Sequence, residues 1–134
     1  MQEKLGIGNK EVFKSASALA GGVARQGETC GALLGSIMAI GVEVGREKLE
    51  DKERYQKAME PAMEMYAKFK KQVGHTLCQE IHRIRFGRVY RMYIPEERDA
   101  FHNMGGHSRK GCPEVCGIAA KIASEIILKL RKRK

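Results

Sequence analysis

The side chains of this 134-residue sequence that offer the most chemistry are its four cysteines, Cys30, Cys78, Cys112 and Cys116. No apolar run approaches the roughly 20 residues of a membrane span, and the N-terminal segment lacks the basic start and apolar stretch of a secretory signal. We therefore expect a cytoplasmic protein with no membrane segment, whose thiols are kept reduced. Four cysteines in that compartment indicate metal binding or redox chemistry, although cysteine also serves as a small core hydrophobe.

The cysteines coincide with the predicted starts of helices. Cys30 and Cys78 each fall in the first turn of a predicted helix. Cys112 stands at the start of the last predicted helix, and Cys116 lies one turn further on. A helix N-terminus carries unpaired N–H groups and about half a positive charge, which favour thiolate over thiol. The sequence therefore predicts lowered thiol pKa values and sulfur atoms suited to nucleophilic attack or metal binding.

The spacing of cysteines and histidines adds a second indication. Cys112 and Cys116 are four residues apart and share a helical face, as do Cys78 and His82. His107 precedes Cys112 by five residues, so a zinc site could draw four ligands from this set. The spacing matches no standard zinc module, and the alternative is that the histidines are surface or hydrogen-bonded residues. The pattern is not CxxCH, so covalent haem attachment has no signature.

Helical periodicity dominates the remaining sequence, and we predict a single all-α domain over residues 1–134, a compact bundle of about five or six helices. Pro61 is expected to kink or divide one of them. The one strand candidate is RVYRMYI, residues 88 to 94. The expected helices cover residues 9 to 24, 28 to 45, 49 to 73, 76 to 86 and 95 to 101, and a last helix begins at Pro113.

Two groups of residues on these helices bear on a site. Gly31 and Gly35 share a face of the second helix, where small residues let another backbone or a cofactor approach closely. The third helix carries five large side chains at helical spacing. We expect these to fill the core rather than line a sulfur-rich cofactor pocket; they are Met59, Met63, Met65, Tyr66 and Phe69.

The formal net charge is +9, but residues 129 to 134 carry five of the positive charges, which leaves +4 on the body. A short basic tail of this kind is typical of a frayed, solubilising terminus, so we do not expect a nucleic-acid-binding protein. An alternative function is that of a basic interaction protein. Its binding surface would combine the tail with Arg83, Arg85, Arg88 and Arg91. Gly-rich helix faces are also compatible with a homo-oligomer.

The segment GETCGALLGSIMAIGVEVGRE, residues 27 to 47, resembles the signature of the redox-active proteins of the C_GCAxxG_C_C type, small proteins with a CGAxxG core. In this sequence the core begins at Cys30. Cys78, within TLCQEI, is similar to the family's later cysteine, and Cys112, within CPEVCGIAAKIASEI, is similar to its last. The resemblance extends over residues 5 to 128.

The resemblance implies a redox-active protein, and related domains occur in haem- and iron–sulfur-containing electron-transfer proteins. The family pattern usually includes a further cysteine ahead of the segment that matches residues 5 to 20. In this sequence the fourth cysteine is instead Cys116, beside Cys112.

The leading hypothesis is a thiol-based redox or electron-transfer protein that acts with a redox partner protein. Cys30 and Cys112 would be its primary pair, and Cys78 and Cys116 its resolving thiols. The second hypothesis is a metal-binding module that holds an iron–sulfur cluster or zinc through the same cysteines, with the two histidines as further candidate ligands. Haem, an iron–sulfur cluster and zinc are all compatible with the sequence, which requires none of them and defines no enzymatic reaction.

Overall fold

The computed structural model describes residues 1–133, and these form an all-α fold, as predicted. Among them are seven α-helices, slightly more than the five or six expected, because the N-terminal region forms two short helices. The elements, in chain order, are α1 (Gln2–Leu5), α2 (Lys10–Ser15), the 3₁₀ helix η1 (Ser17–Leu19), α3 (Gly31–Val44), α4 (Lys52–Val73), α5 (Cys78–Phe86), α6 (Pro95–Asn103) and α7 (Cys112–Lys132).

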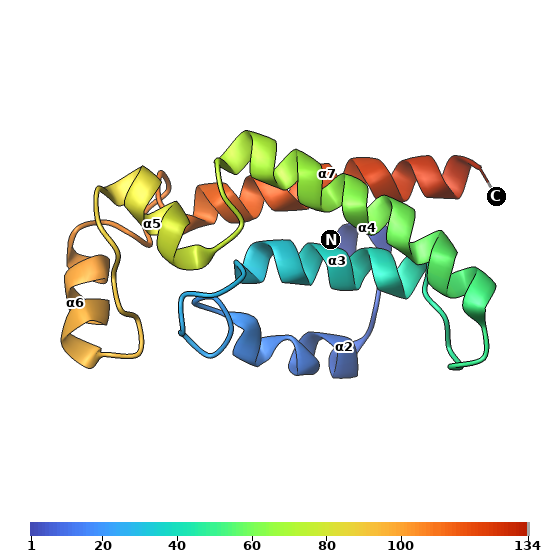
Figure 1. The fold of residues 1–134 in the computed structure, drawn as a ribbon, viewed down its shortest axis with the longest axis horizontal. Coiled ribbons are helices and arrows are strands. Elements are labelled where there is room, and N and C mark those ends of the chain that lie inside the picture. The colour runs from blue at the N-terminus through green and yellow to red at the C-terminus, as the bar shows by residue number, and fades with distance from the viewer. Residues whose placement is uncertain (134) are drawn as a thin grey trace.

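The three long helices α3, α4 and α7 pack against one another and enclose the main core. Figure 1 shows α4 and α7 along one side of α3, α2 along its other side, and α5 and α6 together at one end. The apolar stripe predicted for the last helix lies in this core, since Ala119, Ile122 and Ile126 are buried at helical spacing. A smaller apolar cluster around Phe101 lies with α5 and α6.

The helix predicted over residues 9 to 24 ends much earlier, and this prediction was wrong. After η1 the backbone reverses its hand, and the five consecutive residues from Gly21 to Arg25 all have positive φ. The N–H of Ala24 donates to the carbonyl of Ala18 at 2.7 Å, which closes this left-handed turn. Two glycines begin it because only glycine adopts left-handed φ without steric cost, and the three residues after them carry the strain.

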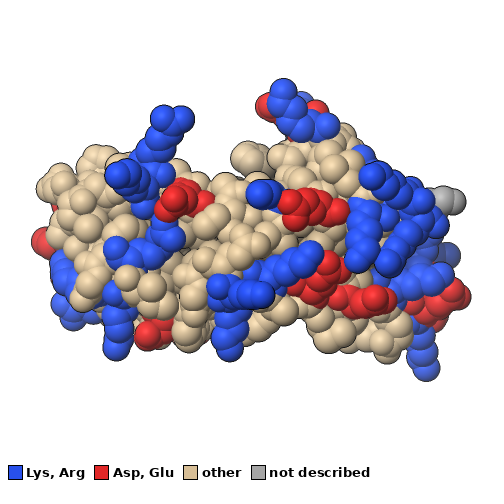
Figure 2. All heavy atoms as spheres, turned by 90° about the horizontal axis from the view of Figure 1, so that it is seen from above, with Lys and Arg blue, Asp and Glu red and all other residues tan. Residues whose placement is uncertain are grey.

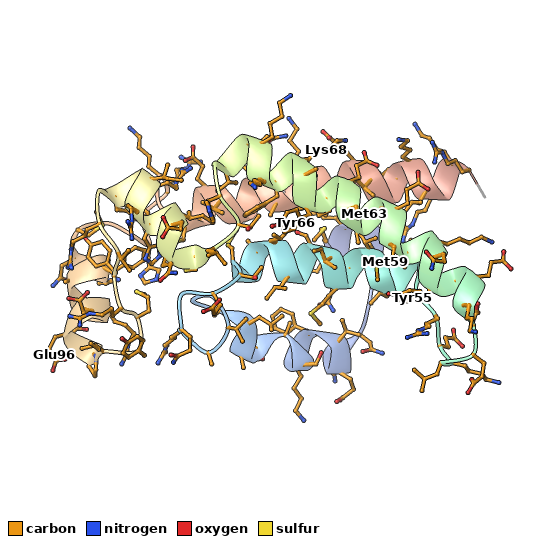
Figure 3. All side chains as sticks on the ribbon, viewed as in Figure 1. Tyr55, Met59, Met63, Tyr66, Lys68 and Glu96 are labelled. Carbon is orange, nitrogen blue, oxygen red and sulfur yellow. The ribbon has the colours of Figure 1, made fainter. Side chains whose placement is uncertain are left out.

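The helix α4 continues through Pro61 as one element rather than two (Figure 1). Proline removes one backbone donor, but Pro61 is buried on the same face as Met65 and Phe69, so packing holds the helix together. The expectation of core burial is only half right for this stretch. Met59, Met63 and Tyr66 lie along an exposed edge of α4, as Figure 3 shows.

Two other expectations of local structure need correction. Residues 88 to 94 form no strand, and within residues 1–133 the β-type pairing is a single antiparallel bridge between Thr29 and Leu77. The basic tail is helical as far as Lys132, and Arg131 binds the Glu43 carboxylate at 2.9 Å. Lys134 lies outside the described residues. In the part of the chain that the structure describes, no helix combines the length and the apolar character needed to cross a membrane.

Candidate functional site

The Thr29–Leu77 bridge fixes the positions of the first two cysteines. The N–H of Cys30 donates to the Thr76 carbonyl at 2.8 Å, and the N–H of Cys78 donates to the Glu28 carbonyl at 2.7 Å. Each cysteine therefore follows a bridged residue and stands at the start of a helix. Cys30 is the N-cap of α3 and Cys78 is the first residue of α5, as the sequence predicted to within two residues.

A tight loop before α7 positions the other two cysteines. Cys112 is the first residue of α7, and its N–H donates to the Gly106 carbonyl at 2.8 Å. Gly106 has no room for a side chain, because an added Cβ would lie 2.3 Å from the Phe101 ring. The loop is thereby held against α6, and Cys116 lies one helical turn beyond Cys112 on α7.

All four cysteines line one cavity of about 390 Å³, which we call the thiol cavity. It lies where the starts of α3, α5 and α7 meet, at the end of the bundle that α5 and α6 occupy in Figure 1. All four sulfurs are free thiols. His82 and His107 line the same cavity, so the structure brings every candidate cysteine and histidine to one place.

The prediction of lowered thiol pKa values is wrong. Burial raises the pKa of Cys78 to about 12 and that of Cys112 to about 11, and it raises the pKa of Cys30 and Cys116 as well. The helix N-termini are present, but the loss of hydration of a thiolate in this apolar setting outweighs their partial charge. At neutral pH the four groups are therefore thiols.

Backbone hydrogen bonding lowers the pKa and acts against burial at Cys30 and Cys116, but not at Cys78 or Cys112. At Cys30 the groups that lower the pKa are the backbone N–H groups of Ala32 and Leu33, in the first turn of α3. The charges of Cys30 and Cys112 are each coupled to those of all three other cysteines. Cys116 is the exposed cysteine.

His82 is the buried polar group of the site, with 2% of its surface exposed. Its Nε2 lies 3.7 Å from the Cys78 sulfur, one helical turn away on α5. The ring stacks on Phe101 with 4.5 Å between centroids, and no group within residues 1–133 hydrogen-bonds to its buried Nδ1. Burial, with a smaller contribution from the charge of His107, lowers the pKa of His82 to about 4, so the imidazole is neutral at pH 7.

The side chains do not form a ready-made metal site. Within residues 1–133, no three or more histidine, cysteine, aspartate or glutamate side chains are arranged to hold a metal ion. His107 instead faces His102, with 3.4 Å between their Nδ1 atoms. The zinc ligand set that the sequence indicated therefore stays a prediction.

The two glycines of the CGAxxG core have different surroundings. An added Cβ at Gly31 would lie 2.7 Å from the Leu19 carbonyl oxygen, so Gly31 lets the chain after η1 lie against α3. An added Cβ at Gly35 would meet no atom within 4 Å, and Gly35 lines the thiol cavity. The sequence reading missed Gly22, where an added Cβ would lie 2.6 Å from the Cys78 Cβ. The adjacent glycines Gly21 and Gly22 were the sequence feature that could have indicated a close backbone approach here.

The four arginines of the alternative basic surface are all engaged in ion pairs. Arg83 pairs with Glu80, Arg85 with Glu114, and both Arg88 and Arg91 pair with Glu97. Figure 2 shows Lys and Arg side chains at both ends of the molecule, most densely at the end where α7 finishes. The side chains of Arg83, Arg88 and Arg91 nevertheless remain 49% to 60% exposed, so the basic interaction surface stays a prediction.

The chain matches the family described as "Putative redox-active protein (C_GCAxxG_C_C)" over residues 1–126. It belongs to this family. Searches of curated proteins and of solved structures find no match. The family match spans α1 to most of α7 and so includes the thiol cavity with all four cysteines.

Proposed function

We propose that this protein is a thiol-based redox protein that cycles pairs of cysteines in the thiol cavity between dithiol and disulfide. The observation that carries the proposal is that all four cysteines, from the starts of three different helices, line one cavity. Membership of a family described as redox-active supports it. A purely structural role for the cysteines would not require them to gather around an open space.

Oxidation of one pair removes two protons and two electrons and replaces two S–H bonds with one S–S bond. The electrons pass to an oxidised partner protein or another two-electron acceptor, and the reverse reaction restores the thiols. The attacking group is a thiolate, so the cysteine that ionises most readily begins the reaction. Cys30 fits this role, because the backbone N–H groups of Ala32 and Leu33 lower its pKa and act against burial.

The test is a count of free thiols in protein purified without oxygen, before and after equilibration in thiol–disulfide buffers of stepped potential. We expect thiols to disappear in pairs and to return on reduction. Replacing Cys30 with serine should abolish the first pairing step, whereas Cys112→Ser should leave an alternative pair. Four thiols that stay unmodified across the range of potentials would refute the proposal.

A second candidate function is metal binding by the same four cysteines, as zinc or an iron–sulfur cluster. The raised thiol pKa values do not oppose it, because a bound cation deprotonates its thiol ligands. It does require side chains to rearrange, since no ligand group is preformed among residues 1–133. An absorption spectrum and metal analysis of anaerobically purified protein distinguish the two functions. Metal content that is unchanged in the Cys→Ser variants would exclude the second.

A further inference from the structure

A second cavity adjoins the thiol cavity. It has a volume of about 460 Å³ and lies between α1, α2, α3 and α7, and we call it the apolar chamber. The two cavities share five lining residues, among them Gly31, Gly35 and Cys116. The exposed thiol therefore stands at the junction, with the chamber on one side and the other three cysteines on the other.

The chamber walls are apolar and in part uncovered. Ile7, Val12, Met38 and Ala120 contribute to them, and Phe13 and Val42 line the chamber while 71% and 46% exposed. No residue of α2 is buried, so this helix stands as an outer wall over a space that side chains leave open. Apolar surface that adjoins a cavity and remains uncovered is typical of a ligand site.

The charges that line the chamber and the volume of the chamber indicate what kind of ligand it would bind. In the described part of the chain, the charged side chains that line the chamber are Glu3 and Lys4, of opposite sign, both on α1. An anionic ligand such as a small peptide disulfide would lose its hydration against these apolar walls and would meet Glu3 as well as Lys4. A neutral, apolar molecule of ring size fits the volume and would meet Cys116, which lines both cavities.

We propose that the apolar chamber binds a neutral, apolar two-electron acceptor of the quinone class and presents it to the thiols at Cys116. This rests on the proposed thiol redox function and names its acceptor. Cys116 and Cys30 together lose two electrons and two protons and form one disulfide. The two carbonyl oxygens of the quinone take up those electrons and protons, and the product is the hydroquinone.

The glycines of α3 provide a matched test. A leucine at Gly35 would enter the open space that both cavities share, because no atom lies within 4 Å of an added Cβ. A leucine at Gly41 meets equally open space on the same helix but lines neither cavity. Both substitutions raise helix propensity alike, so Gly41→Leu controls for the change in helix stability.

The probe is decylubiquinone, whose fully substituted ring gives no addition products with thiols. We expect it to oxidise the reduced wild type and Gly41→Leu at the same rate, and the mass of each to fall by that of two hydrogens. Gly35→Leu should react about tenfold more slowly, the effect of losing the contact of about two methylene groups. Equilibrium dialysis against the Cys116→Ser variant, which lacks the reacting thiol, measures quinone binding alone. Adding Gly35→Leu to this variant should weaken binding by the same factor.

A small water-soluble oxidant, diamide, separates this inference from the proposed function. Because Gly35 also lines the thiol cavity, each quinone rate is divided by the diamide rate of the same protein. A ratio that falls in Gly35→Leu but not in Gly41→Leu supports both the inference and the proposed function. An equal ratio in Gly35→Leu and Gly41→Leu overturns the chamber as the binding site, and so does a wild type that forms a disulfide with diamide but not with the quinone. A wild type that forms no disulfide with either oxidant overturns the proposed function itself.

Discussion

Acid should destabilise this fold through one histidine. His82 is buried and neutral, and its pKa is lowered to about 4 from the 6.5 of an exposed imidazole. Between these two values the unfolded chain binds a proton at His82 that the folded chain does not. Protonation therefore favours unfolding, and the stabilisation is complete above pH 6.5 and is lost as the pH falls towards 4.

The size of the effect follows from the pKa difference. Each unit corresponds to about 1.4 kcal/mol, so the full loss below pH 4 is about 3 kcal/mol. At pH 4.5, where most of the window has been crossed, the loss is about 2 to 3 kcal/mol. This is a large share of the 5 to 15 kcal/mol that is typical of a domain's free energy of unfolding.

Urea unfolding of reduced, metal-free protein at pH 7 and pH 4.5 measures this loss. His82→Phe keeps an aromatic ring against Phe101 but cannot take up the proton, so its free energy of unfolding should fall by about 2 kcal/mol less over the same interval. His102→Gln, at an exposed position, should retain the wild-type dependence. An equal fall in wild type and His82→Phe would refute the reasoning.

Three further predictions concern the thiol cavity. Gly31→Ala should lower the free energy of unfolding by about 1 to 3 kcal/mol in urea titrations, because its Cβ would collide with a backbone carbonyl that cannot move freely. Iodoacetamide at pH 8 should modify Cys116 first and Cys78 last, as peptide mass spectrometry can show, because Cys116 is exposed and burial raises the pKa of Cys78 to about 12. Arg85→Gln should raise the pKa of Cys112 further, since the guanidinium charge lowers it, and the pH profile of Cys112 alkylation should move to higher pH.

Each of these predictions has a direct counter-result. Gly117→Ala adds a Cβ to open space on a helix and should stabilise the fold by up to about 1 kcal/mol, so equal effects at Gly31 and Gly117 would contradict the steric argument. Modification of Cys78 before Cys116 would contradict the burial pattern. An unchanged Cys112 profile in Arg85→Gln would show that the arginine charge does not reach that sulfur.

Much of the fold could be predicted from the spacing of apolar residues and from the residues that begin or end helices. The buried stripe of α7 and the starts of the helices at Cys30, Cys78 and Cys112 follow from apolar spacing, glycine breaks and the proline after Cys112. The placement of the thiols at helix starts was therefore predictable. Their meeting in one cavity was not, because it depends on the Thr29–Leu77 bridge, a long-range backbone contact with no local sequence pattern.

The errors have physical causes that local sequence does not reveal. Val23, Ala24 and Arg25 have no intrinsic preference for left-handed backbone, and backbone hydrogen bonds to the residues just before the turn hold them there. The direction of the thiol pKa values depends on burial, which is a property of the assembled cavity rather than of any one helix start. The apolar chamber is also a product of assembly, since it lies between elements from both ends of the chain.

The backbone bridge between Thr29 and Leu77 also determines when the site forms during folding. It joins segments that α3 and α4 separate, so the chain must close a long loop before Cys30 and Cys78 become neighbours. Until then the thiols are hydrated and ionise with a pKa of about 8.5, as in any unfolded chain. The thiols therefore react with oxidants more readily in the unfolded chain than in the folded protein. A reducing environment matters most while the chain folds.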